Sequence, residues 1–308
     1  MQAKEYLNRR HFLKTSATAA IGMGLGHSSL SAATRPRNLS EFRGVELAIA
    51  SICCDGFSNQ GHRPTFDILP QTPFRNVEFN LWYPNTITPS YIDSLKERCN
   101  QTNLIPVSLQ GSSFGGEGNA GIIKDLSHKL ALLDRCRELG CRRLKFTGAR
   151  RGTQGGLDSI IAVLKELAPV AEDHGMLILL ENHVNNVLER IEDYDTIFNK
   201  IDSPNVGLCL DTGHFEGVNV SLESVIERFH NRTLHVDLKD CRARGAGHDT
   251  VVFGEGVTDF KSFLDQLISY DYSGYLVIEQ AWREPKEPLL ENLKAAHQLF
   301  QPFETGRA

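Results

Sequence analysis

The sequence predicts an α/β protein, a single-domain (β/α)8 TIM barrel in which eight parallel strands alternate with helices. The first reason is that short β-rich runs alternate with helical patterns from residue 45 to the end, and eight such runs occur. The second is that the first run leads into ASICCDG, residues 50–56, which lacks the GxGxxG of a dinucleotide-binding sheet. We therefore expect a closed barrel and not a doubly wound open sheet.

Eight β-rich runs are the predicted barrel strands. They cover Val45–Ala50, Asn76–Asn80, Leu104–Leu109, Arg143–Thr147, Met176–Glu181, Val206–Asp211, Thr233–Leu238 and Gly274–Glu279. Helical periodicity is clearest at Pro89–Gln101, Ile122–Leu139, Leu157–His174, Leu222–Phe229, Phe260–Tyr270 and Pro288–Phe300. Ser221 is placed to cap a helix, and Gly140 and Gly175 stand where helices are expected to end.

The first residues predict an export signal. NRRHFLK at residues 8–14 precedes a weakly apolar run at residues 15–30 and then the small residues SAAT. This order is typical of a removable signal peptide, so we expect a signal at 1–33 and the barrel at 34–308. Arg9 and Arg10 resemble the twin-arginine signal, which exports proteins that have already folded. The expected location is periplasmic or extracellular.

Charge and cysteine content limit the classes of partner. The formal net charge of −5 becomes −8 when residues 1–33, with four basic and one acidic side chain, are removed. An acidic surface disfavours a nucleic-acid partner. The seven cysteines are odd in number and show no CxxC spacing, so no disulfide framework is inferred. No later stretch approaches the roughly 20 apolar residues of a membrane helix, so stable membrane insertion is not expected.

Acidic side chains end three of the last four predicted strands. The fifth strand, MLILLENH, is apolar until Glu181, the sixth, VGLCLDTGH, until Asp211, and the eighth, GYLVIEQ, until Glu279. Because a barrel brings its strand ends to one mouth, these carboxylates are expected to lie together. Gathered carboxylates repel one another and need an offsetting positive charge. A divalent cation with oxygen and imidazole ligands would supply it, and Mn, Mg, Co or Zn would all suit.

The seventh strand, in TLHVDLKD, carries its polar residues on one face. His235, Asp237 and Lys239 alternate with three apolar residues, so they share a side of the strand. Such a row is either a solvated strand face or part of a binding site. The acids at the neighbouring strand ends favour the site.

Four motifs carry a family resemblance. LLENH, LCLDTGHF, LHVDLKDC and LVIEQ, in this order, resemble the xylose-isomerase-like TIM barrel superfamily, the sugar phosphate isomerase/epimerase group. In that group one divalent metal is held by residues from strands five to eight. The resemblance implies the ligands Glu181, Asp211 and Glu279, together with one residue of the seventh strand.

The ligand on the seventh strand departs from the family pattern. Relatives read HVHLKD and use the second histidine, whereas Asp237 occupies that position in this chain. Asp237 as a ligand would make an all-carboxylate site that favours Mn, or Mg, over Zn. His235 is the alternative, if the metal lies about 6.6 Å deeper, the rise of two strand residues. Strand geometry favours Asp237, because the other ligands lie at strand ends.

The resemblance implies an isomerase or epimerase that acts on a keto sugar or polyol by proton abstraction next to a metal-held carbonyl. Glu181 and Glu279 are the implied acid/base residues. An exported lyase or dehydratase for 3-keto-sugars, or a non-catalytic sugar-binding barrel, is the alternative. A type 2 AP endonuclease is disfavoured, because SLQGSS and KFTGAR lack its additional histidines.

Further polar residues near strand ends are candidates for substrate contact. They are His214, His235, Lys239 and Glu78, with Lys145 and His248 as additional candidates for the pocket. The sequence leaves open which sugar binds, whether it is phosphorylated, and whether the chain forms a homo-oligomer.

Overall fold

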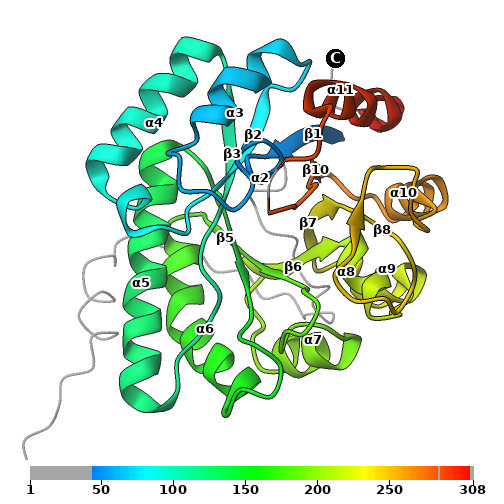
Figure 1. Cartoon of the computed structure of the whole chain (residues 1–308). Coiled ribbons are helices and arrows are strands. Elements are labelled where there is room, and N and C mark those ends of the chain that lie inside the picture. The colour runs from blue at the N-terminus through cyan, green and yellow to red at the C-terminus, as the bar shows by residue number, and fades with distance from the viewer. Residues whose placement is uncertain (1–43, 284, 306–308) are drawn as a thin grey trace, which may run out of the picture. The chain divides into compact units, whose positions relative to one another are not determined.

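The computed structural model describes residues 44–283 and 285–305, and its centre is a closed barrel of parallel strands (Figure 1). Around the barrel the strands run in the order β1-β10-β7-β6-β5-β4-β3-β2. They are β1 (Val45–Ala50), β2 (Asn76–Asn80), β3 (Ile105–Gln110), β4 (Arg143–Thr147), β5 (Leu177–Glu181), β6 (Val206–Asp211), β7 (Thr233–Leu238) and β10 (Gly274–Ile278). The predicted (β/α)8 barrel is confirmed, with strand bounds that differ by one residue at most.

Helices surround the barrel (Figure 1). They are α2 (Ile52–Asp55), α3 (Arg63–Ile68), α4 (Pro89–Thr102), α5 (Gly118–Leu139), α6 (Gly156–Asp173), α7 (Ile191–Phe198), α8 (Thr212–Gly217), α9 (Leu222–Phe229), α10 (Phe260–Ser269) and α11 (Leu289–Phe300). All six helices expected from periodicity are present, and α5 begins four residues earlier than predicted. Ser221 caps α9 by accepting a hydrogen bond from the Ser224 amide, and Gly140 ends α5 with a φ of 92°.

The inner and outer faces of the strands have different chemistry. Val236 and Leu238 of β7 belong to the apolar core, whereas His235 and Asp237 of the same strand are fully buried among polar side chains. The alternation predicted for TLHVDLKD is therefore confirmed, and its polar face points into the barrel. Polar groups buried there need partners, which makes the barrel interior the place to look for a site.

A short hairpin follows β7 and positions the loop beside the barrel mouth. β8 (Asp240–Cys241) pairs antiparallel with β9 (Thr250–Val251). The buried Asp240 carboxylate accepts hydrogen bonds from the backbone N–H groups of Gly254, Gly256 and Thr258 at 2.9–3.3 Å. One carboxylate thus holds the GEG turn against the end of β7.

The seven cysteines are all free and buried, in agreement with the expectation of no disulfide framework. Across the described part of the chain, no helix is both long and apolar enough to cross a membrane. The predicted export signal at 1–33 lies outside the described residues.

Candidate functional site

A cavity of about 520 Å³ opens at the carboxyl end of the barrel strands. Its walls combine strand-end carboxylates with histidines and apolar side chains from the loops. The polar residues central to the argument are Glu181, His183, His214, Lys239, His248 and Glu279. Its position at the strand ends is where barrel enzymes hold their active sites.

Four carboxylates meet at and beneath the floor of this cavity. We call Glu181, Asp211, Asp237 and Glu279 the carboxylate cluster, because each offers an oxygen within 4.8 Å of the others. None is more than 3% exposed. The four predicted metal ligands are therefore brought together from β5, β6, β7 and the end of β10, as parallel strand ends require.

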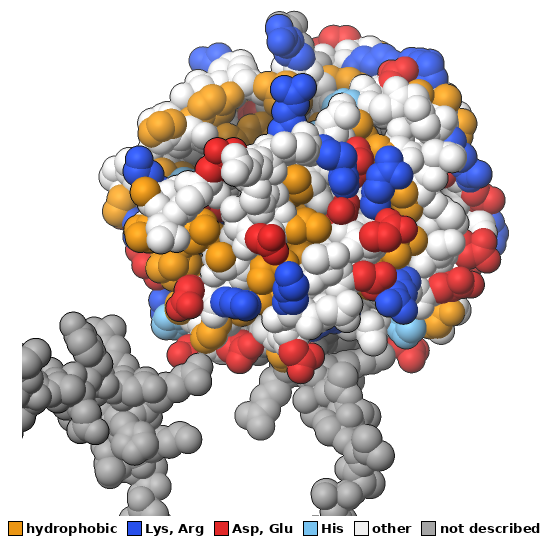
Figure 2. Space-filling model, turned by 90° about the horizontal axis from the view of Figure 1, so that it is seen from below, with side chains coloured by type: hydrophobic (Ala, Val, Ile, Leu, Met, Phe, Trp, Pro, Cys, Tyr) orange, Lys and Arg blue, Asp and Glu red, His pale blue; other side chains and the backbone are white. Residues whose placement is uncertain are grey.

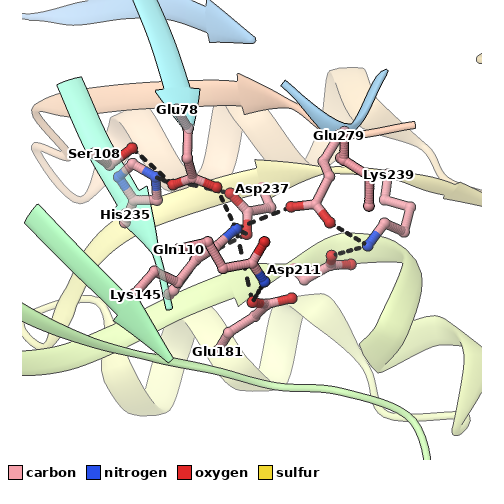
Figure 3. Close-up of polar contacts among 12 residues, drawn as sticks. Glu78, Ser108, Gln110, Lys145, Glu181, Asp211, His235, Asp237, Lys239 and Glu279 are labelled. Atoms are coloured by element: carbon pink, nitrogen blue, oxygen red, sulfur yellow. Dashed lines mark hydrogen bonds and ion pairs between the residues drawn. The ribbon is translucent and has the colours of Figure 1, made fainter. Parts of the chain in front are cut away.

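Lys239 bridges two members of the carboxylate cluster on the cavity side. Its Nζ lies 2.6 Å from Asp211 Oδ2, 3.1 Å from Glu279 Oε1 and 3.1 Å from His214 Nε2 (Figure 3). The neighbouring Asp240 carboxylate does not pair with Lys239; it accepts hydrogen bonds from backbone N–H groups instead. Lys239 and His214 both line the cavity, as their predicted contact with substrate requires.

Lys145 occupies the opposite side of the cluster, below the cavity floor. Its ammonium lies 2.6 Å from Glu78 Oε1, 2.6 Å from Asp237 Oδ2 and 2.9 Å from Glu279 Oε2 (Figure 3). Glu181 is more distant, at 3.7 Å. The barrel interior therefore contains two ammonium groups that offset part of the carboxylate charge.

Glu78 and His235 lie deeper than predicted substrate contacts should. Both are fully buried and do not line the cavity. Glu78 Oε2 accepts a hydrogen bond from Ser108 at 2.7 Å and lies 3.2 Å from His235 Nε2. Both residues face the barrel interior one or more residues before their strands end, so they do not reach a ligand in the cavity. Glu78 pairs with Lys145 there, and His235 lies against Glu78.

Glu181 and Glu279 are in different electrostatic environments. Burial raises the pKa of Glu181 to about 8, although the ammonium of Lys145 opposes the shift. Burial would also raise the pKa of Glu279, but Lys145 and Lys239 together outweigh it and hold that pKa well below its usual range. One cavity thus contains a carboxyl that titrates near neutral pH and one that stays ionised.

Neighbouring side chains fix the orientation of two cluster members. Gln110 of β3 donates from Nε2 to Glu181 Oε2 at 2.8 Å. Asn182 accepts a hydrogen bond from the Asp211 amide and donates one to the Asp211 carbonyl. The sequence analysis missed Gln110, because a neutral amide at a strand end has no distinctive pattern. Asn182 was visible only as part of LLENH.

Three histidines gather on one wall of the cavity. The rings of His183 and His214 have centroids 4.1 Å apart, and that of His248 lies 5.0 Å from His214. Burial lowers the pKa of all three, to about 4 for His183. The neutral imidazoles therefore lie beside the carboxylate cluster, with His214 Nε2 3.8 Å from Asp211 Oδ2.

The donor set fits a divalent cation. Carboxylate oxygens with a nearby imidazole are ligands that Mn, Mg, Co and Zn accept, and the groups Glu181, Asp211 and His214 also lie within 4.8 Å of one another. The ammonium of Lys239 stands in for a cation between Asp211 and Glu279. Lys239 lines the cavity on a long, rotatable side chain, and its ammonium would have to withdraw from Asp211 and Glu279 for a cation to bind between them.

Residues 66–301, most of the chain, match the family described as xylose isomerase-like TIM barrel. The chain belongs to the xylose isomerase-like TIM barrel family. This membership confirms the resemblance carried by LLENH, LCLDTGHF, LHVDLKDC and LVIEQ. In this chain, the four motifs end the strands that supply the carboxylate cluster.

Curated relatives in the xylose isomerase-like family include inosose dehydratases. One from Glaesserella parasuis is 32% identical over 145 residues, which are 41% of this chain and 47% of the relative. Another, from Lactiplantibacillus plantarum, is 28% identical over 160 residues, 47% of this chain and 53% of the relative. The chain thus aligns with about half the length of these dehydratases.

Solved structures of the same fold include the IolI protein with a bound zinc atom and a D-allulose 3-epimerase from Methylomonas sp. with D-allulose. The first has a TM-score of 0.70 and 18% identity, and covers 85% of this chain and 99% of that one. The second has a TM-score of 0.69 and 18% identity, and covers 85% and 98%. At this identity the likeness establishes the fold alone.

Proposed function

We propose that the protein is a divalent-metal-dependent enzyme that removes a proton next to the carbonyl of a keto sugar or an oxidised polyol. The observation that carries the proposal is the placement of Glu181 on a cavity wall that also holds Glu279, Lys239 and His214. The inosose dehydratase relatives and the D-allulose 3-epimerase fold neighbour support a polyhydroxylated substrate.

Glu181 is the group that moves the proton. In the metal-free chain, burial brings the pKa of Glu181 to about 8; a bound cation would lower it and leave the carboxylate ionised, ready to accept a proton. Gln110 holds Glu181 Oε2, which leaves the other oxygen for the substrate. Glu279 is the second acid/base candidate, but the two ammonium groups that stabilise its charge also weaken it as a base.

Glu181, Asp211 and Glu279 would hold the cation, and a bound divalent ion would polarise the substrate carbonyl as a Lewis acid. Lys239 lines the cavity, where negative charge develops as the proton leaves, and its ammonium contacts Asp211, Glu279 and His214. His214, at 3.1 Å from Lys239, orients that ammonium. Trp82 and Phe57 cover part of the wall and exclude water from it.

Elimination of water is the second candidate, with the same first step. An epimerase needs two groups that exchange the proton on opposite sides of the substrate. Glu279 is ill suited to return a proton, because the ammonium of Lys145, 2.9 Å away, favours its ionised form. A dehydratase needs one base and one acid near the leaving hydroxyl; Lys239 lines the cavity, but its carboxylate neighbours raise its pKa and weaken it as that acid.

Deuterium exchange would test the proposal. The Mn-loaded protein is incubated with keto sugars and oxidised polyols in D2O, and mass spectrometry follows both exchange of the carbon-bound proton and loss of water. We expect exchange or dehydration with the parent and a loss of about 10² to 10⁴-fold in Glu181→Gln. The exposed Glu166→Gln on α6 is the matched control. If sugars bind but none of them shows proton exchange or loss of water, the result would instead support a sugar-binding barrel.

A further inference from the structure

The ammonium group of Lys145 is a fixed ion inside the barrel. It has no exposed surface, and Glu78, Asp237 and Glu279 lie within 2.9 Å of its Nζ. An ammonium group has three N–H donors, so three carboxylates at these distances use all of them. Lys239 also has three partners within 3.1 Å of its Nζ, but it lines the cavity, which Lys145 does not.

Asp237 faces Lys145 and not the cavity. Its Oδ2 accepts hydrogen bonds from Lys145 Nζ at 2.6 Å and from Cys209 Sγ at 3.1 Å. Its Oδ1 lies 3.8 Å from Nε2 of the buried His235. Asp237 is fully buried and does not line the cavity, whereas Glu181 and Glu279 do.

Strand register explains this depth. Asp237 pairs with Val277, two residues before Glu279, so it lies one inward-facing layer below Glu279. Lys145 likewise pairs with Leu179, two residues before Glu181. Lys145 and Asp237 thus each lie one inward-facing position below a carboxylate at the end of the neighbouring strand, and their 2.6 Å contact joins them beneath the cavity floor.

We propose that Lys145 holds Asp237 as its counter-ion, so that the seventh strand gives no ligand to the divalent cation. The cation is then held by Glu181 and Glu279, which line the cavity, and by Asp211, which pairs at 2.6 Å with the cavity-lining Lys239. Asp237 acts as a positioning residue: it holds Lys145, and Lys145 holds Glu279. This inference rests on the proposed function in that it assumes a divalent cation in the cavity.

The positive charge of Lys145 explains why Asp237 is not both its counter-ion and a ligand of the cation. A cation on Asp237 Oδ2 would share that buried oxygen with the ammonium of Lys145, 2.6 Å away, and Oδ1 lies toward the buried His235, at 3.8 Å from its Nε2. Asp211 is paired equally closely, at 2.6 Å, but its partner Lys239 lines the cavity. Removal of Asp237 from Lys145 would leave a buried ammonium less compensated, which is strongly destabilising. Asp237 stands where relatives have a histidine, and in this chain Lys145 neutralises it by forming an ion pair with it.

Titration of the full chain with Mn²⁺ tests the ligand half of the inference. Free Mn²⁺ is measured by electron paramagnetic resonance for the parent, Asp237→Asn and Asp211→Asn. We expect Asp237→Asn to bind one Mn²⁺ per chain with a Kd within about 3-fold of the parent, and Asp211→Asn to lose about 100-fold in affinity. Equal losses in the two variants would overturn the inference.

Thermal unfolding in EDTA tests the ion pair without any metal. Asp237→Asn is expected to lower the Tm of the parent by several degrees, because Lys145 loses a counter-ion. In a Lys145→Met background the same substitution is expected to raise the Tm, because it removes a carboxylate that has no cation. Equal decreases in both backgrounds would show that the pair is not coupled and would overturn the inference.

The two readouts separate this inference from the proposed function. A parent that binds no Mn²⁺ contradicts the metal in the proposed function, and the unfolding cycle then decides the ion pair. A parent that binds Mn²⁺ beside an Asp237→Asn variant that does not contradicts this inference alone. If Lys145→Met does not fold while the double variant does, the rescue itself supports the pair.

Discussion

Glu181 and Glu279 line the same cavity, yet their neighbours give them different proton affinities. Lys145 and Lys239 lie within 3.1 Å of Glu279, whereas Lys145 lies 3.7 Å from Glu181. Coulomb attraction decreases with distance, so it outweighs the cost of burial at Glu279 and not at Glu181. The difference in pKa between the two carboxyls therefore depends on where the lysines lie, because both residues are glutamates.

A pH-dependent stability follows for the metal-free protein. The folded chain keeps a proton on Glu181 up to a pH of about 8, whereas the ordinary pKa is 4.5. Since the folded state binds more protons than the unfolded state in this window, the Glu181 contribution is present below pH 4.5 and is lost as the pH rises toward 8. We expect a slope of up to about 1.4 kcal/mol per pH unit in urea unfolding with EDTA. Glu181→Gln should show a flatter slope; an unchanged slope would contradict the assignment.

At the scale of elements, the strand ends were predictable and the partners inside the barrel were not. Parallel strands bring their carboxyl ends together, so Glu181, Asp211 and Glu279 could be placed in one site from three separate motifs. The partner of Lys145 could not be found in this way. It depends on the stagger with which β4 faces β7 across the closed barrel, and the residues are 92 positions apart.

The depth of a side chain was equally hard to predict. Alternation along β7 correctly placed His235 and Asp237 on the inner face, but it could not show that Glu78 and His235 lie beneath the cavity floor. Inward-facing layers in a barrel are filled by contributions from several strands, and the sequence of one strand says nothing of the others.

The loop after β7 depends on one carboxylate. Asp240 accepts hydrogen bonds from two backbone N–H groups of the GEG turn and from that of Thr258, and a Cβ on Gly256 would meet its carboxylate. We expect Asp240→Ala to lower the free energy of unfolding by about 1–3 kcal/mol, because buried N–H groups lose their acceptor. Limited proteolysis between residues 242 and 258 should become faster as well.

Gly256→Ala is the companion variant for this loop, since it crowds the same carboxylate while leaving it in place. It should cause the same increase in proteolysis. Gly115→Ala, at a position where a Cβ would meet nothing within 4 Å, serves as the control. If Asp240→Ala leaves both stability and cleavage unchanged, the three hydrogen bonds do not hold the loop.

One face of the molecule carries charges of both signs. On the face in Figure 2, basic and acidic side chains intermingle over the described residues, without the one-sign patch that a phosphate backbone attracts. Inside the barrel, Lys145 and the carboxylate cluster are buried charged groups at the end where the cavity opens. Chemistry and recognition are therefore both expected at the cavity.

The cysteines bear on the predicted export route. All seven are free and buried, and burial raises the pKa of the Cys53 and Cys99 thiols to about 12. Such thiols are poorly reactive, because the thiolate is the reactive form. A chain with seven buried thiols is best folded where cysteines stay reduced, and the twin-arginine route carries proteins after folding.

Replacement of both Arg9 and Arg10 by lysine is therefore expected to keep the protein in the cytoplasm of an expressing bacterium. The parent protein should instead appear outside the cytoplasm, with residues 1–33 removed, as judged by cell fractionation and mass spectrometry of the N-terminus. Lys4→Gln, which changes a basic residue outside the pair, is the matched control. Export of the double-lysine variant at the parent level would contradict the twin-arginine prediction, and the folded barrel would then need a different explanation for its unpaired cysteines.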